Sequence, residues 1–274
     1  GDLVLVEELS YFLPNMIFGQ AGARLRTVPV DSEGMQVQQI EELFKPGEIR
    51  FVYLNSRCQY PTAVSLSEQR KLRLLELAEA YDFIVIEDDG DFEFSWSRER
   101  EGSLFRKDGG NRVLHTGSFG SFLMPGFQMQ FLAGPGDLLE EARKYRDIFG
   151  KPNFMIEKAL GEIIHQGDIH RYQRKALKVI SERKEAFSQL LQQHFKDEII
   201  YEVPRSGLAF WIRFKKPISL TRLQESAARK GLLLPAICMY QDRRLTALRL
   251  GFAHLDEAGL EESVRILGEG YWSI

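Results

Sequence analysis

Residues 50–94 read RFVYLNSRCQYPTAVSLSEQRKLRLLELAEAYDFIVIEDDGDFEF. The runs at 50–54 and 83–86 are apolar and rich in β-branched and aromatic residues, so each predicts a strand. Between them, residues 65–81 carry apolar side chains at nearly helical spacing, namely Leu74, Leu75, Leu77 and Ala78. Strand, helix and strand predict a right-handed βαβ unit, which is typical of α/β proteins.

Four further β-rich runs lie outside this stretch, at residues 3–6, 25–30, 112–115 and 129–133. Most of the predicted strands lack strict alternation, and several are nearly continuous apolar runs. That pattern is typical of strands covered on both faces, as in a parallel or mixed sheet. Either Ser65 or Ser67 would cap the helix predicted at 65–81, because a serine hydroxyl accepts a hydrogen bond from a free N–H of the first turn.

After Pro135 the pattern becomes helical. Long amphipathic segments predict helices at 137–149, 154–165 and 169–195. The rest is mixed, with strands expected at 207–214 and 248–252 and helices at 219–230 and 256–268. We therefore expect a large domain at 1–150, a helical connector at 151–187 and a small C-terminal α+β domain at 188–274.

Composition restricts the classes of function. The chain has 274 residues, with 36 Lys and Arg against 39 Asp and Glu, a net charge of −3 that gives no basic footprint for nucleic acid or an anionic membrane. No apolar run approaches the ~20 residues of a membrane span. Cys58 and Cys238 make no disulfide or zinc framework, so a cytoplasmic location is expected. The chain begins at Gly1 inside a strand-like run, and we expect sequence upstream of it.

Acidic residues fill most of the segment 87–94, EDDGDFEF, directly after a predicted strand. The carboxyl ends of strands face the ligand crevice in α/β sheets, so these acids could bind a cation or a protonated ring nitrogen. A solvated acidic loop is the simpler alternative. No histidine lies nearby in the sequence, and we predict no metal site.

Two other segments could bind anions. Residues 116–128, TGSFGSFLMPGFQ, could surround an anion with backbone N–H groups, although a plain turn explains them equally well. No Lys or Arg lies between Arg112 and Arg143, whereas strong phosphate sites usually contain one. Arg249 lies inside the apolar run LRLGFA and could hold a carboxylate with its guanidinium fork. A structural salt bridge is the alternative for Arg249.

Taken together, these segments resemble the aminotransferase-type domain of the MocR family, GntR-type transcription regulators with a C-terminal domain of fold-type I that depends on pyridoxal phosphate (PLP). The resemblance covers nearly the whole chain and keeps the family's motifs in order. The matching segments are GDLVLVEE (1–8), VPVDSEG (28–34), QYPTA (59–63), EDDGDFEF (87–94), GSFGSFLMPGFQMQF (117–131) and RLGFA (249–253). It implies an α/β fold with a mixed, mostly parallel sheet flanked by helices and a smaller C-terminal α+β lobe.

Three positions keep the residue type that the family uses. The resemblance implies that Asp88 pairs with the pyridine nitrogen of the cofactor, that Ser118 belongs to the same cofactor site, and that Arg249 holds the carboxylate of the substrate. These are vestigial cofactor-binding and substrate-binding residues.

Three other positions depart from the family. The Schiff-base lysine falls on Ser121, the phosphate-binding arginine on Gln128 and the ring-contacting tyrosine on Gly90. A serine hydroxyl cannot form a stable imine with the aldehyde, so we assign no catalytic residue. Loss of the arginine removes charged hydrogen bonds worth ~1.5–3 kcal/mol each.

The resemblance therefore implies an aminotransferase-like effector-binding or dimerisation domain of a MocR-type regulator, without transaminase activity. PLP is the ancestral cofactor and is not expected to bind covalently here. The implied partners are a second copy of the chain, a small carboxylate or amino-acid-like effector, and DNA only through a helix-turn-helix domain that this chain lacks; no membrane partner is expected. Two alternatives stay open, an active PLP-dependent aminotransferase with an atypical site and a purely structural dimerisation module.

Overall fold

The computed structural model describes residues 1–90, 102–119, 129–150 and 153–274. It divides into two compact units: Gly1–Gln173 with Arg205–Gly207, and Arg174–Pro204 with Leu208–Ile274. The boundary falls inside one long helix, α8 (Asp168–Phe195). The predicted domain ranges 1–150, 151–187 and 188–274 place the boundary differently and stay a prediction.

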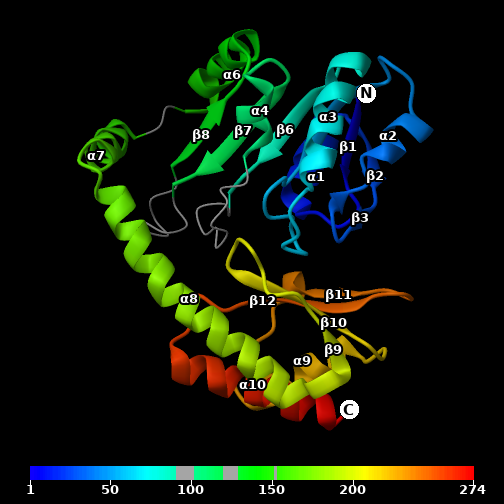
Figure 1. Ribbon diagram of the computed structural model, residues 1–274, viewed down its shortest axis with the longest axis vertical. Coiled ribbons are helices and arrows are strands. Elements are labelled where there is room, and N and C mark those ends of the chain that lie inside the picture. Colours follow the sequence, from blue (N-terminus) through cyan, green and yellow to red (C-terminus); the bar gives the residue numbers. More distant parts are fainter. Residues whose placement is uncertain (91–101, 120–128, 151–152) are drawn as a thin grey trace. The chain divides into compact units, whose positions relative to one another are not determined.

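The first unit contains a six-stranded sheet in the order β2-β1-β5-β6-β7-β8 (Figure 1). The strands are β1 (Leu3–Glu7), β2 (Arg24–Val28), β5 (Ile49–Leu54), β6 (Ile84–Asp88), β7 (Val113–Ser118) and β8 (Gln130–Ala133). All neighbours pair in parallel except β7 and β8, which are antiparallel. A separate two-stranded sheet joins β3 (Val30–Asp31) to β4 (Gly34–Met35). The mixed, mostly parallel sheet predicted from the sequence is confirmed.

Some helices of the first unit connect these strands, and the others follow β8. They are α1 (Phe12–Gln20), α2 (Gln38–Leu43), α3 (Glu68–Tyr81), α4 (Leu104–Asp108), α6 (Gly136–Phe149), α7 (Phe154–His165) and the start of α8. The predicted helix at 65–81 is α3, which begins three residues later than expected because Ser67 is its cap and accepts from the N–H of Arg70. The βαβ unit predicted from β5, α3 and β6 is therefore present.

Apolar side chains cover both faces of this sheet, which explains its nearly continuous apolar strands. On one face, Val52 and Leu54 of β5 pack into a buried cluster that includes Leu74 of α3. On the opposite face, Tyr53 forms a second cluster, and Phe18 of α1 packs against it. Alternate residues of one strand thus enter two cores, as expected from a period of two.

The second unit is built on an antiparallel sheet in the order β11-β12-β10-β9. Its elements are the end of α8, β9 (Ile199–Ile200), β10 (Ala209–Phe214), α9 (Leu220–Arg229), β11 (Met239–Gln241), β12 (Thr246–Gly251) and α10 (Glu257–Trp272). Ser219 caps α9 by accepting from the N–H of Arg222. This unit has the α+β makeup expected of a smaller C-terminal lobe. Across the described part of the chain, no helix has the length and apolar character needed to cross a membrane.

Glu7, the last residue of β1, is a buried acid that links two strands. Its carboxylate accepts from the N–H of Asn55, just beyond β5, at 3.1 Å. Burial raises the pKa of Glu7 to about 8, because it outweighs the hydrogen bonds from Asn55 and Gln59 that lower the pKa, and nearby Asp88 raises it further. Glu7 is therefore held mostly as the neutral acid at neutral pH.

The titration of Glu7 gives a pH-dependence of stability with a defined sign. Because its folded-state pKa lies above the unfolded value of 4.5, the stability that protonated Glu7 contributes is complete below that value and is lost as pH rises to about 8. We expect Glu7→Gln, which stays neutral, to gain stability relative to the wild type by up to ~1.4 kcal/mol per pH unit across this interval. Urea unfolding of both proteins at several pH values measures the difference.

Exposed Glu8, the next residue in the chain, provides the matched control. Glu8→Gln should follow the wild-type curve at every pH. If the free energies of unfolding of the wild type and of Glu7→Gln changed in parallel with pH, the pKa of Glu7 would be the same in the folded and unfolded chains, which would contradict the prediction.

Candidate functional site

The candidate site lies where four parallel strands end side by side. The strands β1, β5, β6 and β7 are neighbours, and each pair runs in parallel, so their carboxyl ends share one edge of the sheet. Glu7 ends β1, Asn55 follows β5, Asp88 ends β6 and Ser118 ends β7. Ligands of open α/β sheets bind at this kind of edge.

Glu87 is the structural anchor of this edge. It is fully buried, and its carboxylate accepts from the N–H of Leu104 at 2.7 Å and of Phe105 at 3.0 Å, at the start of α4. Ser56 donates its hydroxyl to the same carboxylate, and Nδ1 of His115 lies 3.0 Å from it. The carboxylate therefore joins β6 to β7, α4 and the loop after β5.

The hydrogen bonds around Glu87 keep it charged. Burial alone would raise its pKa, but the hydrogen bonds from His115, Ser56, Phe105 and Leu104 outweigh burial and lower the pKa below its ordinary value. A buried carboxylate of this kind stabilises the fold above its unfolded-state pKa, because it is already ionised there. Glu87 is therefore a structural charge rather than a proton donor.

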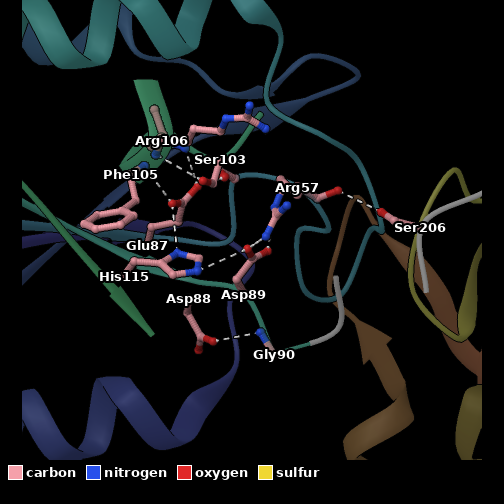
Figure 2. Close-up of polar contacts among 12 residues, drawn as sticks. Arg57, Glu87, Asp88, Asp89, Gly90, Ser103, Phe105, Arg106, His115 and Ser206 are labelled. Atoms are coloured by element: carbon pink, nitrogen blue, oxygen red, sulfur yellow. Dashed lines mark hydrogen bonds and ion pairs between the residues drawn. The ribbon is translucent and has the colours of Figure 1, made fainter. Parts of the chain in front are cut away.

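Asp89 is a second anchored acid on the same side as Glu87 (Figure 2). It forms an ion pair with Arg57, whose Nε lies 3.0 Å from Oδ1, and Nε2 of His115 lies 3.8 Å from Oδ2. The backbone carbonyl of Arg57 in turn accepts from the hydroxyls of Ser65 at 2.8 Å and Ser206 at 2.7 Å. The ion pair thus fixes the loop after β5.

Asp88 lies between these two acids and points to the opposite side (Figure 2). Tyr53 donates its hydroxyl to one carboxylate oxygen at 2.6 Å, and the N–H of Gly90 donates to the other at 3.3 Å. Burial, and then the negative charge of Asp88, raise the pKa of Tyr53, so the phenol stays protonated and donates. Of the three described acids Glu87, Asp88 and Asp89, Asp88 is the half-buried one and can face a ligand.

Gly90, which the resemblance places at the family's tyrosine position, has room for a side chain. A Cβ placed there would lie 3.7 Å from the nearest oxygen of Asp88, an ordinary contact, and its φ is not in the left-handed region. The backbone of the described segment therefore does not require glycine at this position.

The structure places the predicted site residues unevenly. Ser118 and Asp88 lie on neighbouring strands at the shared edge, whereas Arg249 lies in the second unit on β12, opposite Trp211. Ser121 and Gln128 lie outside the described residues. The expectation of a solvated acidic loop is wrong for Glu87 and Asp89, because both are buried and paired. Within the described ranges, no group of His, Cys, Asp and Glu could hold a metal ion.

Sequence reasoning missed the partners that shape the edge: Glu7, Tyr53, Asn55, Arg57 and His115. Each is far from its partner along the chain, so no local motif marks it. The available signal was position, since Glu7 and Asn55 end predicted strands in the same way as Asp88. A search for polar residues at the ends of all the predicted strands would have found both.

Comparison with known proteins agrees with this architecture. The profile of the family described as aminotransferase class I and II matches residues 1–267. Aromatic-amino-acid aminotransferase 1 of Thermococcus litoralis is 27% identical over 279 residues, which cover 98% of this chain and 66% of that protein. The probable rhizopine catabolism regulatory protein MocR of Rhizobium meliloti is 23% identical over 277 residues, which cover 100% of this chain and 55% of that protein.

Among solved structures, kynurenine aminotransferase of Pyrococcus horikoshii, crystallised in complex with PMP, superposes with a TM-score of 0.88 at 26% identity. The match covers 100% of this chain and 70% of that one. The chain thus spans about half to two thirds of the length of several curated relatives, which include both regulators and aminotransferases. Because the family profile extends over nearly its whole length, this chain belongs to the aminotransferase class I and II family.

Proposed function

We propose that this chain is the aminotransferase-like effector-binding and dimerisation domain of a MocR-type transcription regulator, acting in the cytoplasm without transaminase activity. Regulators of this type are among its relatives, and the similarity to one named MocR covers the whole chain. In this proposal, DNA is bound through a separate helix-turn-helix domain and the present chain responds to a small carboxylate or amino-acid-like effector.

The observation that carries the proposal is the absence of a suitable lysine. The residues after β1, β5, β6 and β7 carry no lysine in their described parts, and the family's lysine position is Ser121. Nearby, Lys71 and Lys107 both form ion pairs with Glu68. The chemistry of these residues does not fit a covalently held PLP, because an imine needs a free amine at the cofactor aldehyde.

The contacts of Asp88 support the same proposal. Each of its oxygens already accepts one hydrogen bond, from Tyr53 or from Gly90, so this carboxylate has partners within the chain and does not require a cofactor to offset its burial. A buried or half-buried acid without such partners would require a ligand to offset its desolvation. The contacts of Asp88 are therefore compatible with a domain that no longer binds PLP and that binds another ligand at this sheet edge.

The alternative of an active aminotransferase has two observations in its favour. Asp88, Ser118 and Arg249 keep the family's residue types, and several relatives are named as aminotransferases. Such an enzyme would need to hold its cofactor without a lysine at position 121. The spectroscopic experiment below separates it from our proposal.

Apolar side chains around the end of α6 and the start of α7 support the proposed homodimer. Four large ones are more than two thirds exposed: Ile148, Phe149, Phe154 and Met155. Exposed apolar surface marks an interaction site where it is contiguous, and each helix contributes two of these side chains from adjacent positions. A second copy of the chain is the occupant we propose for it.

For the cofactor, we expect no covalent adduct. The purified protein mixed with PLP should not develop the yellow absorbance of a lysine imine, since Ser121 cannot form one. Borohydride treatment followed by peptide mass mapping should find no lysine in the first unit that carries the cofactor. A specific, stoichiometric adduct on one lysine would favour the active enzyme instead.

Restoring the family's residues at the three altered positions tests why transaminase activity would be lost. Ser121→Lys alone should restore little transamination, because Gln128 and Gly90 still lack the phosphate and ring contacts. The triple variant Ser121→Lys, Gln128→Arg, Gly90→Tyr should bind PLP as a reducible imine, and its matched control is the double variant without Ser121→Lys. Transamination by the single variant at the level of the triple would contradict our account.

For the assembly, light scattering at micromolar concentration should give twice the mass of the chain. The double variant Phe149→Glu, Phe154→Glu places charges in the proposed interface and should give a monomer. Leu233→Glu, at an equally exposed position of the second unit, should remain a dimer. A monomeric wild type, or a double variant that stays dimeric, would contradict the proposed interface.

A further inference from the structure

Positive charge is concentrated in two segments of the second unit. Residues 213–222, RFKKPISLTR, carry four cations and no acid, and residues 241–245, QDRRL, carry two cations and one acid. These segments therefore have a net charge of +5, in a chain whose net charge is −3. All six cations are exposed, and we call them the end cluster: Arg213, Lys215, Lys216, Arg222, Arg243 and Arg244.

The strand register places both segments at the same end of the sheet. β10 runs antiparallel to β12, with Arg213 opposite Ala247. β12 begins at Thr246, which pairs with Gln241 of β11, so residues 242–245 form the turn between these two strands. The end of β10 therefore lies beside the β11–β12 turn, and both are at the right of the second unit in Figure 1.

One side chain joins the two segments directly. Gln241 donates from Nε2 to the carbonyl of Ile218 at 2.6 Å, and its Oε1 accepts from the N–H of Leu220 at 3.1 Å. Leu220 is the first residue of α9, so this contact holds the first turn of the helix, with Arg222, beside the β11–β12 turn. The start of a helix also carries a partial positive charge, which adds to the charge of the end cluster.

The acids near the end cluster leave most of its charge available. Asp242 is used within its own turn, where Oδ1 accepts from two backbone N–H groups at 2.6 and 2.7 Å. Glu198 forms an ion pair with Lys216 at 3.1 Å and accepts from the hydroxyl of Tyr271 at 2.7 Å. One acid thus forms the turn, and the other neutralises a single cation of the six.

We propose that the end cluster binds the phosphate backbone of duplex DNA without reading its sequence. Hydrogen bonds from Lys and Arg to phosphate oxygens, with the release of counterions, supply affinity of this kind. The inference rests on the proposed function as part of a DNA-binding regulator, and it adds a second DNA contact to that of the separate helix-turn-helix domain. The net charge of the chain does not reveal this surface, because it averages the end cluster with a more acidic remainder.

The composition of the two loops favours duplex DNA over other polyanions. Single-stranded nucleic acid is bound by stacking its bases on aromatic side chains, and residues 215–219 and 241–245 contain no aromatic residue. An anionic membrane surface is bound by cations together with exposed large apolar side chains. The large aliphatic residues of these loops, Ile218 and Leu245, are both half-buried. A regular array of phosphates is therefore the partner that these loops fit.

Fluorescence anisotropy with a labelled duplex of about 20 base pairs and arbitrary sequence tests the proposal, at salt concentrations between about 50 and 200 mM. The wild-type chain should bind, with an affinity that falls steeply as salt rises. The double variants Arg243→Gln, Arg244→Gln and Lys215→Gln, Lys216→Gln should each weaken binding at the lowest salt by about tenfold or more. Each should also reduce the slope of log affinity against log salt by about two.

The matched control removes two exposed cations from the first unit. Lys45→Gln, Arg50→Gln changes the net charge by the same amount and should leave the slope unchanged. An equal loss of affinity in this control would overturn the assignment to the end cluster, and so would tighter binding to a polyglutamate peptide of equal charge than to the duplex. A wild-type chain without salt-dependent binding would overturn the inference alone, because the PLP and light-scattering experiments test the proposed function separately.

Discussion

The hydrogen bonds of Glu87 hold together the edge on which the rest of the candidate site depends. A charged carboxylate can be buried here because it receives two backbone N–H groups from the first turn of α4, the hydroxyl of Ser56 and the ring of His115. An N-terminal turn has free N–H groups and a favourable field for an anion. Without the acid, those N–H groups would be buried and unsatisfied, so the acid and the helix stabilise each other.

The neighbouring acids show how one short segment can serve two purposes. Glu87 and Asp89 point into the protein and bind His115 and Arg57, whereas Asp88 points to the opposite side and binds Tyr53. Strand alternation alone produces this division. Glu7 adds a third kind of acid to the edge, buried with few partners and therefore neutral near pH 7. The charge at the edge is thus set by hydrogen bonding as much as by composition.

Most of the regular fold could be predicted from sequence patterns, but the short elements could not. The helix predicted at 154–165 is α7 (Phe154–His165), and the predicted strands of the large sheet are present within a few residues. We did not predict α1, because its sequence FLPNMIFGQ is mostly apolar and has no polar face to give a helical period. We also missed α4, a helix of five residues whose first N–H groups are bound by Glu87. Ser103 caps it and Gly109 follows its end, but a helix this short is marginal without tertiary contacts, and no local pattern records the contact with Glu87.

The site was predicted in the same uneven way. Asp88 was found because it follows a strand in a distinctive acidic segment. Its partner Tyr53 lies 35 residues away, and His115 lies 28 residues from Glu87, so these contacts exist only after the sheet has formed. The solvated acidic loop was a reasonable alternative for a run of acids, but it did not allow for partners from other elements, namely Arg57 in the loop after β5 and the N–H groups at the start of α4.

Because different acids stabilise the sheet edge and face its open side, the structure has an evolutionary consequence. The side chains that stabilise the sheet edge are different from the one that can face a ligand, and the backbone at neighbouring Gly90 does not require glycine. Substitutions that remove chemistry therefore need not remove stability. A lineage can lose a reaction while selection for folding preserves the architecture, which leaves a stable edge available for a different ligand.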